Sequence, residues 1–533
     1  MLLAICGCRR TAGDAPISQR AIGELLADRF TIGRLAGQTA WQSCVVQDTA
    51  TVVPRARCGK PLAQQPRRSG RIQSLARELH RLTGTDSTPL YLRAGALLEL
   101  SAGAASPNAI DRAVMSLEHA RRVAPRDPEV LNDLAVAYLE LGQHDQRLES
   151  MLHALDAVER ALELDSTLTA ALFNRALILE RLYMVASAQQ AWSRYLAVEQ
   201  DNGWRKEANE HLTRLTPNTP DRMWADIRSG SPADGDALSA NVIAVVKRAP
   251  QDARDSAFAL LREWGAAARS GDTARATKPL MLAREIARAF DTLDLDRSVS
   301  LAIHAIDLVR GNAVHTSALA SAHVDLADGI ALSSKGVLDS AVACLTQGER
   351  GLRSAGSPAA RWAALYHATS EVEQGRFENA DRRLERLMTE TTPYEPALRG
   401  KVVWVEGVSQ LRRGNFENAI RLYRAARDSI ARAREPENNA AIYYLLTEAL
   451  DLAGQASPGR DEAYAGLKLL SPFRRSNYLN NHLTNVASVA RRDGLGYAAL
   501  AIMHEVLDVA PRVGRPQVVA WAHRAQAREL MMV

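Results

Sequence analysis

The sequence is poor in cysteine, aromatic residues and long apolar runs, and each shortage excludes a class of protein. Five cysteines in 533 residues are too few for a disulfide scaffold. Aromatic residues reach only 5% while alanine is abundant, a balance that favours helices over strands. No apolar stretch approaches the length of about 18 residues that a transmembrane helix needs, so we expect none. A chain of 533 residues also exceeds what one hydrophobic core spans, so it is multi-domain or a stacked array.

Positive charge is confined to the N-terminal part of the chain. Residues 1–75 contain 11 Lys and Arg against 4 Asp and Glu, whereas the remaining 458 residues contain 55 against 57. A nucleic-acid-binding protein of this size would carry a basic face on its folded part. We therefore expect no nucleic acid as a partner and interpret Arg67, Arg68 and Arg71 as part of a solvated basic head.

The first residues leave two compartments open. Ile5-Cys6-Gly7-Cys8 resembles the end of a bacterial lipoprotein signal, with Cys8 as the lipidated residue, although the apolar run before it is short. The alternatives are a lipid-anchored envelope protein with an upstream start codon and a cytoplasmic protein with incidental cysteines. The cytoplasmic interpretation is slightly favoured, and contact with a membrane is expected only through such an anchor. Cys44 and Cys58 fit either a disulfide of the head or two reduced thiols.

A repeat of 39 residues organises the second half of the chain. Three glycines, each followed two positions later by a large residue and three further on by alanine, begin its segments: Gly336-Val-Leu338-Asp-Ser-Ala341, Gly375-Arg-Phe377-Glu-Asn-Ala380 and Gly414-Asn-Phe416-Glu-Asn-Ala419. Gly454 and Gly494 continue the series. The glycine suits a tight helix–helix turn, and the alanine suits a close crossing of two helices.

This order of small, bulky and turn residues resembles the tetratricopeptide repeat, and weaker copies precede it between residues 76 and 215. The resemblance implies an all-α solenoid of helical hairpins, a superhelix, with a small non-helical N-terminal head. We predict a head at 1–75, a first array at 76–215, a Pro- and Gly-rich linker at 216–237 and a second array at 238–533. The second array is expected to end on an unpaired helix, which suggests a truncated chain.

Several chemical motifs were tested and rejected. Gly33-Arg34-Leu35-Ala36-Gly37-Gln38-Thr39 has too few residues between its glycines for a phosphate loop, and Gln38 stands in place of the lysine. His504-Glu505-Val506-Leu507-Asp508 lacks the second histidine of a zinc-protease helix. Cys344 is interpreted as a structural thiol. We therefore expect no enzyme activity, no metal and no cofactor.

The first helices of a tetratricopeptide superhelix line its concave face, and the repeat frame predicts which residues of this chain lie there. A protein or peptide ligand is the expected partner. The alternative is that these residues are core. The predicted groove residues are Trp362, Leu365, Trp404, Val408, Tyr444, Glu448, Asn481, Thr484 and Arg491. The sixth repeat positions, which hold a terminal carboxylate in some tetratricopeptide domains, include Asp133, Asn174, Tyr366 and Val405, so that clamp is not reproduced.

A closer resemblance covers about residues 80–533. The segment from Ala171 to Leu182, with Ala191-Trp192 and Gly203 to Ala208, is similar to the repeat half of bacterial CHAT proteins, as is Asn438 to Leu452. The resemblance implies the regulatory or sensing half of a protein whose caspase-like peptidase domain is absent from this chain. We thus expect a non-enzymatic interaction scaffold. The alternatives are part of a caspase-like cysteine protease and a lipid-anchored ligand sensor.

Overall fold

The structure of the protein is a computed structural model. It describes residues 14–42 except 30 and 40, then 44–46, 56–58, 73, 74, 77, 88–102, 108–215, 227, 235–474, 476–513 and 516–531. Cys8, the predicted lipidation site, and most of the predicted linker at 216–237 lie outside these residues.

The chain divides into two compact units. Unit 1 combines residues 1–217 with residues 474–533, and unit 2 consists of residues 218–473. The sequence-based boundaries differ from this division, because they assign residues 474–533 to the second array. The repeat period continues smoothly through Gly454 and Gly494 and therefore gives no sign of the change of unit.

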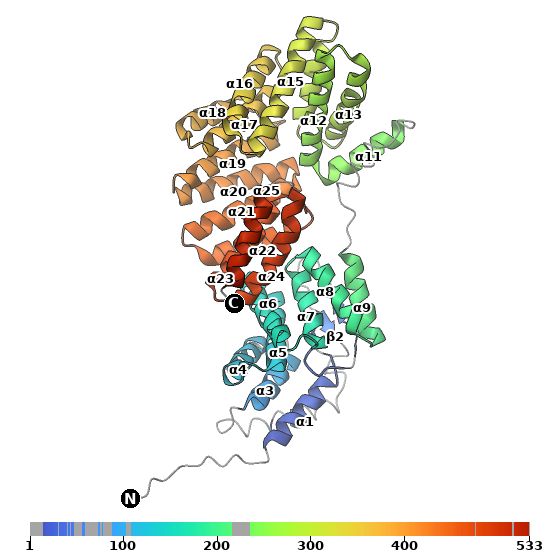
Figure 1. Ribbon diagram of the computed structural model, residues 1–533, viewed down its shortest axis with the longest axis vertical. Coiled ribbons are helices and arrows are strands. Elements are labelled where there is room, and N and C mark those ends of the chain that lie inside the picture. Colours follow the sequence, from blue (N-terminus) through green and yellow to red (C-terminus); the bar gives the residue numbers. More distant parts are fainter. Residues whose placement is uncertain are drawn as a thin grey trace, which may run out of the picture. The chain divides into compact units, whose positions relative to one another are not determined.

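In its described residues, unit 1 contains a first array of paired helices and, at the C-terminal end, three α-helices and a short 3₁₀ helix. Its helices are α1 (Asp14–Leu26), α3 (Pro89–Ala102), α4 (Ala109–Val123), α5 (Pro128–Asp145), α6 (Leu148–Leu164), α7 (Thr169–Arg181), α8 (Val185–Val198), α9 (Asn202–Arg214), α23 (Asn477–Arg492), α24 (Gly496–Val509), the 3₁₀ helix η3 (Ala510–Val513) and α25 (Pro516–Leu530). Helices α3, α5 and α7 each pair with the next helix, as in a helical-hairpin array (Figure 1).

Unit 2 is a second array. Its helices are α11 (Gly235–Arg248), α12 (Pro250–Arg269), α13 (Thr273–Thr292), α14 (Ser298–Leu308), α15 (Ala313–Ser334), α16 (Leu338–Ser354), α17 (Ala359–Glu373), α18 (Phe377–Glu390), α19 (Pro396–Arg412), α20 (Phe416–Ala433), α21 (Pro436–Leu452) and α22 (Ala456–Leu470). The predicted fold class, an all-α helical-hairpin solenoid of tetratricopeptide type, is confirmed by this architecture.

The repeat residues have the local roles that their types suggest. The five repeat glycines, from Gly336 to Gly494, all have φ between +74° and +79°, a region that side chains other than glycine rarely adopt. At the helix crossings, a Cβ on Gly407 would lie 2.5 Å from the Tyr423 ring. The small first-helix residue thus makes room for the bulky second-helix residue, as the repeat pattern predicts.

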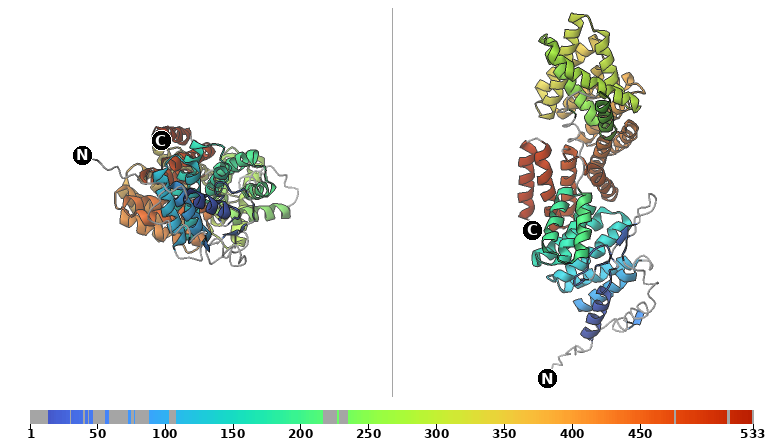
Figure 2. Two further views of the ribbon diagram at one scale, coloured as in Figure 1. Left: turned by 90° about the horizontal axis from the view of Figure 1, so that it is seen from below. Right: turned by 90° about the vertical axis from the view of Figure 1, so that its right-hand side faces the viewer.

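Two buried carboxylates attach the C-terminal helices to the first array. Asp156 of α6 accepts the backbone N–H groups of Tyr497 and Ala498 at the start of α24, at 3.0 and 3.3 Å. Glu505 of α24 in turn accepts the N–H of Ser187 at the start of α8, at 2.7 Å. Both carboxylates satisfy N–H groups that a helix start leaves unpaired. Helix α24 therefore contacts α6 and α8. The C-terminal helices, coloured red, lie beside the teal helices of the first array in Figures 1 and 2.

The head contains more regular structure than expected. Residues Asp14–Leu26 form helix α1, which packs against α3 and buries Ala21, Ile22 and Leu25. Strands β1 (Cys44–Val46) and β2 (Ala56–Cys58) pair antiparallel, with the backbone of Cys44 opposite Cys58. Direct antiparallel partners have Cα separations of about 4.5–5.5 Å, a spacing that a disulfide spans, so the disulfide stays a prediction. None of the described helices combines the length and apolar character needed to cross a bilayer.

Candidate functional site

A stretch of the head that forms neither helix nor strand, residues 29–42 except 30 and 40, lies against the first helices of the first array. We call this stretch the inserted segment, and the surface of α3, α5, α7 and α9 that contacts it the first-helix face. Asn174 of α7 binds both backbone groups of Arg34: its Oδ1 accepts the N–H at 2.6 Å and its Nδ2 donates to the carbonyl at 2.7 Å. Asn132 of α5 donates to the same carbonyl at 3.1 Å. The segment is thus held through its backbone.

The neighbouring alternate residues are held in the same way. Glu140 accepts the N–H of Ile32 at 2.7 Å, and Asp133 accepts the N–H of Ala36 at 2.7 Å. Arg93 of α3 donates to the Ala36 carbonyl at 2.7 Å. Residues 32, 34 and 36 therefore direct their N–H groups to the helices with the period of two of an extended chain. Side chains of three successive first helices replace the neighbouring strand of a sheet.

Arg29 occupies a buried site of its own. Its side chain is 1% exposed and forms a bidentate ion pair with Glu207 of α9, at 2.6 and 2.8 Å. The guanidinium carbon lies 4.4 Å from the centroid of the Trp204 ring and 5.6 Å from that of Phe173. Trp41 completes the contact by donating its indole N–H to Glu207 at 2.8 Å. Bidentate pairing and ring stacking are both contacts that arginine makes and lysine does not reproduce.

Arg34 occupies a second site beside the same indole. Its guanidinium pairs with Glu199, donates a hydrogen bond to the Tyr195 hydroxyl at 2.9 Å, and lies 4.6 Å from the Trp204 ring centroid. Burial alone would raise the pKa of Glu199, but hydrogen bonds from the Asp201 backbone and from Arg34 outweigh burial and hold the pKa below its usual value. Glu199 therefore presents a negative charge to the arginine at neutral pH.

Glycine is required where the inserted segment passes closest to the helices. A Cβ on Gly33 would lie 2.9 Å from a methyl group of Val136 and 3.0 Å from Asn174 Oδ1, so a side chain would push the backbone off its partners. Gly37 has φ of +82° and turns the chain after Ala36. These are the two glycines of the rejected phosphate-loop motif, and here they serve close packing and a turn.

The groove residues predicted in unit 2 fall into two groups. Trp362 and Trp404 are 1% and 5% exposed, and Leu365 is buried as well. Trp362 lies under Arg254, whose guanidinium carbon is 4.4 Å from the ring centroid, and Lys401 Nζ lies 3.7 Å from the centroid of Trp404. Their burial favours the alternative that these three residues are core of unit 2.

The other predicted groove residues are only half-buried. Val408, Tyr444 and Glu448 belong to unit 2, and burial raises the pKa of Glu448 against the opposing hydrogen bond from Tyr444. Asn481, Thr484 and Arg491 lie on α23 and belong to unit 1. The structure therefore assigns the predicted set to two different units.

The rejected chemical motifs have structural contacts. Glu505 of the zinc-like sequence is a buried residue of α24. It accepts the N–H of Ser187 at the start of α8 and pairs with Arg474. Asp508 also pairs with Arg474, at 2.7 Å. Burial and the nearby Asp325 and Asp328 raise the pKa of the Cys344 thiol, which disfavours a thiolate nucleophile. Among the residues that the structure describes, no three His, Cys, Asp or Glu side chains come together as metal ligands would.

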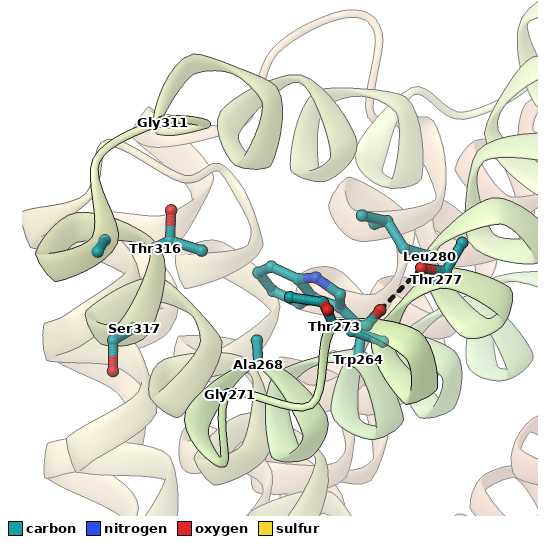
Figure 3. A pocket seen from close by; sticks show the side chains of 11 residues that line it. Trp264, Ala268, Gly271, Thr273, Thr277, Leu280, Gly311, Thr316 and Ser317 are labelled. Carbon is teal, nitrogen blue, oxygen red and sulfur yellow. Dashed lines mark hydrogen bonds between the residues drawn. The ribbon is translucent and has the colours of Figure 1, made fainter.

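Unit 2 also has a cavity of about 440 Å³ between α12, α13 and the start of α15. Its wall includes Trp264, Ala268 and Leu280, with the hydroxyls of Thr273 and Thr316 among the few polar groups (Figure 3). No charged side chain lines it. The cavity has the size of a small-molecule site but carries no group that would orient a ligand's charge.

Helices that pair in successive hairpins define the class of tetratricopeptide-type helical solenoids. No protein-family model matches the chain, and no curated protein matches it. Solved structures do: Cut9 in the APC/C hetero-tetramer Cut9–Hcn1 shares 15% identity over 82% of this chain and 96% of that chain, at a TM-score of 0.31. Yeast Tom70 shares 14% over 83% and 96%, with a TM-score of 0.29. A Rap protein complexed with competence and sporulation factor shares 10% over 68% and 97%, with a TM-score of 0.30.

Proposed function

We propose that this protein is a non-enzymatic interaction scaffold whose first-helix face binds an extended peptide of a partner protein. The bidentate contact of Asn174 with the backbone of Arg34 carries the proposal. An amide side chain that satisfies both the N–H and the C=O of one residue recognises extended backbone whatever the side chain of that residue. Asp133 and Glu140 accept backbone N–H groups two residues to either side and support the same interpretation.

The test uses the full-length chain with the two anchors of the inserted segment removed, Arg29→Ala and Arg34→Ala. A fluorescent peptide with the sequence of residues 27–42 should then bind saturably, because the face regains the contacts that its own segment has lost. Adding Asn174→Ala should weaken this binding by about 30- to 1,000-fold, since a hydrogen-bond pair is removed and a buried N–H loses its acceptor. Asn209→Ala on the exposed side of α9 is the matched control. Absence of binding to a variant with native helix content would refute the proposal.

The half-buried residues Val408, Tyr444 and Glu448 of unit 2, and Asn481, Thr484 and Arg491 of α23, are proposed as additional partner contacts. Substitution of Tyr444 by alanine is the most direct check, because its ring is partly accessible. Binding of a captured partner should weaken while the circular dichroism spectrum stays native. Unchanged binding would remove Tyr444 from the contact surface.

A CHAT-type regulatory role is the finer part of the proposal. It is supported by the similarity of residues 171–182 to the repeat half of those proteins, a stretch that includes Asn174 on the first-helix face. In such a role, peptide binding would change the activity of a caspase-like peptidase. The test is to mix the purified chain with a bacterial CHAT peptidase, with and without the peptide of residues 27–42, and to measure cleavage of a fluorogenic substrate. Equal rates would argue against this role and leave peptide binding untouched.

A further inference from the structure

We propose that the partner peptide carries two arginines five residues apart, in the order Arg-x-x-x-Gly-Arg-x-Ala. We further propose that the protein's own residues 29–36, which have this sequence, occupy the site until such a peptide displaces them. The inference rests on the proposed peptide-binding function and adds the chemistry of the ligand to it. Three observations support the inference: the two arginine sites, the close packing of the backbone against the helices between these sites, and the buried charges of the first-helix face.

The spacing of the arginines follows from a single aromatic ring. The guanidinium carbons of Arg29 and Arg34 lie 4.4 and 4.6 Å from the centroid of the same Trp204 ring, and each arginine has its own carboxylate, Glu207 or Glu199. A cation on an indole face and in a carboxylate fork has little freedom to shift. A ligand whose arginines are four or six residues apart would place only one of them.

The residues before and after the second arginine are limited by space. Gly33 passes so close to Val136 that a Cβ would meet the Val136 methyl group at 2.9 Å. Ala36 is fully buried, with its N–H on Asp133 and its carbonyl on Arg93. A larger residue at either position would have to displace packed side chains. Glycine and a small residue are therefore part of the recognised sequence.

The buried charges that contact the inserted segment distinguish a ligand-binding site from a surface that only packs against a structural segment. The inserted segment contacts the carboxylates of Asp133, Glu140, Glu199 and Glu207. Of these, Asp133 is also paired with Arg93 of α3, whereas Glu199 and Glu207 pair with Arg34 and Arg29 of the segment itself. Buried ion pairs add little stability compared with apolar residues of the same size, but they discriminate strongly between partners. The two carboxylates of Glu199 and Glu207 match a ligand that brings two positive charges.

The experiment measures competition by a panel of peptides for the full-length Arg29→Ala, Arg34→Ala variant, using fluorescence anisotropy. The peptide with the sequence of residues 27–42 is the reference. Replacing either arginine by alanine should weaken binding by about 10–100-fold, the factor expected for hydrogen bonds to a charged group. Inserting one residue between the arginines, or replacing the glycine by valine, should weaken binding at least as much. Replacing an arginine by lysine should also weaken it, because bidentate contact is lost.

The outcomes separate this inference from the proposed function. Binding that ignores arginine identity and spacing overturns the inference and leaves a general peptide site. No binding by any peptide overturns both. Should the variant lose its helix content, the wild-type chain is used instead: excess reference peptide should speed hydrogen exchange of residues 31–38, and an unchanged rate overturns the displacement. A wild-type dimer in light scattering that the reference peptide dissociates would assign the site to a second copy and overturn the partner assignment.

Discussion

Substitution of Asn174 by alanine is expected to release the inserted segment while leaving the array folded. The side chain makes three hydrogen bonds, with the N–H of Arg34 at 2.6 Å, with its carbonyl at 2.7 Å and with Asn132 at 2.8 Å. Only the two bonds to Arg34 are broken when the segment opens. At about 0.5–1.5 kcal/mol for each of them, and with the Arg34 N–H left buried without an acceptor, the free energy of segment opening should fall by about 2–4 kcal/mol. The opening equilibrium should therefore increase by about 30- to 1,000-fold.

Hydrogen exchange followed by mass spectrometry measures this opening directly. In the wild-type chain, the amides of Ile32, Arg34 and Ala36 should exchange slowly although they belong to no helix or strand, because side chains accept all three. In Asn174→Ala, exchange of the peptide covering residues 31–38 should accelerate by the factor given above, while peptides from α6 stay protected. Asn209→Ala, which removes an exposed hydrogen bond of α9, is the control. Rapid exchange of residues 31–38 in the wild-type chain, or equal rates in the two variants, would refute the reasoning.

Three further predictions concern stability. Burial raises the pKa of Glu140 to about 7 from 4.5, so this residue contributes stability at low pH that is lost as the pH rises through about 7. The variant Glu140→Gln does not titrate and should show a smaller loss of stability between pH 5 and pH 8. The difference, measured by urea unfolding at the two pH values, should be on the order of 3 kcal/mol at most. Asp156→Ala should destabilise the docking of α24 by about 1–2 kcal/mol, seen as faster exchange in α24, whereas Asp156→Asn keeps an acceptor and should lose less. A Cβ on Gly265 would lie 2.5 Å from the carbonyl oxygen of Ala320, so Gly265→Ala should lower the melting temperature; Gly95→Ala, with open space around it, should raise stability by about 0.5–1 kcal/mol. Equal effects of the two glycine substitutions would contradict the packing argument.

The helical arrays were predictable because each repeat contains the residues that determine its own turn and its own helix crossing. Gly375 and Gly414 adopt the predicted turn conformation, and Gly407 approaches Tyr423 as their spacing indicates. These contacts join residues within about one repeat, where the sequence pattern is periodic. The change of unit at residue 474 was not predictable in this way, since it depends on Asp156 and Glu505, which are matched to residues more than 300 positions away.

The candidate site was missed for a related reason. Asn174 was recognised as a sixth-position residue, but its partner Arg34 lies in the head, 140 residues earlier, in a stretch without periodicity. Gly33 and Gly37 attracted attention only as part of a failed phosphate motif. The sequence feature that indicates the site is the combination of acidic residues at inward-facing positions of the first helices with a short basic segment in the head. Conversely, aromatic residues at groove positions, such as Trp362, turned out to be covered by Arg254.

The return of the chain to its first unit has a consequence for synthesis. Helix α8 cannot receive Glu505, nor Asp156 the start of α24, until the ribosome has made the intervening residues, 318 and 341 positions later. At about 5–20 residues per second, the first array must persist for roughly 20–70 s with one flank uncovered. Throughout that interval the Asp156 carboxylate and the N–H groups at the start of α8 lack their partners from α24. A chaperone at the ribosome exit would encounter the chain in this state.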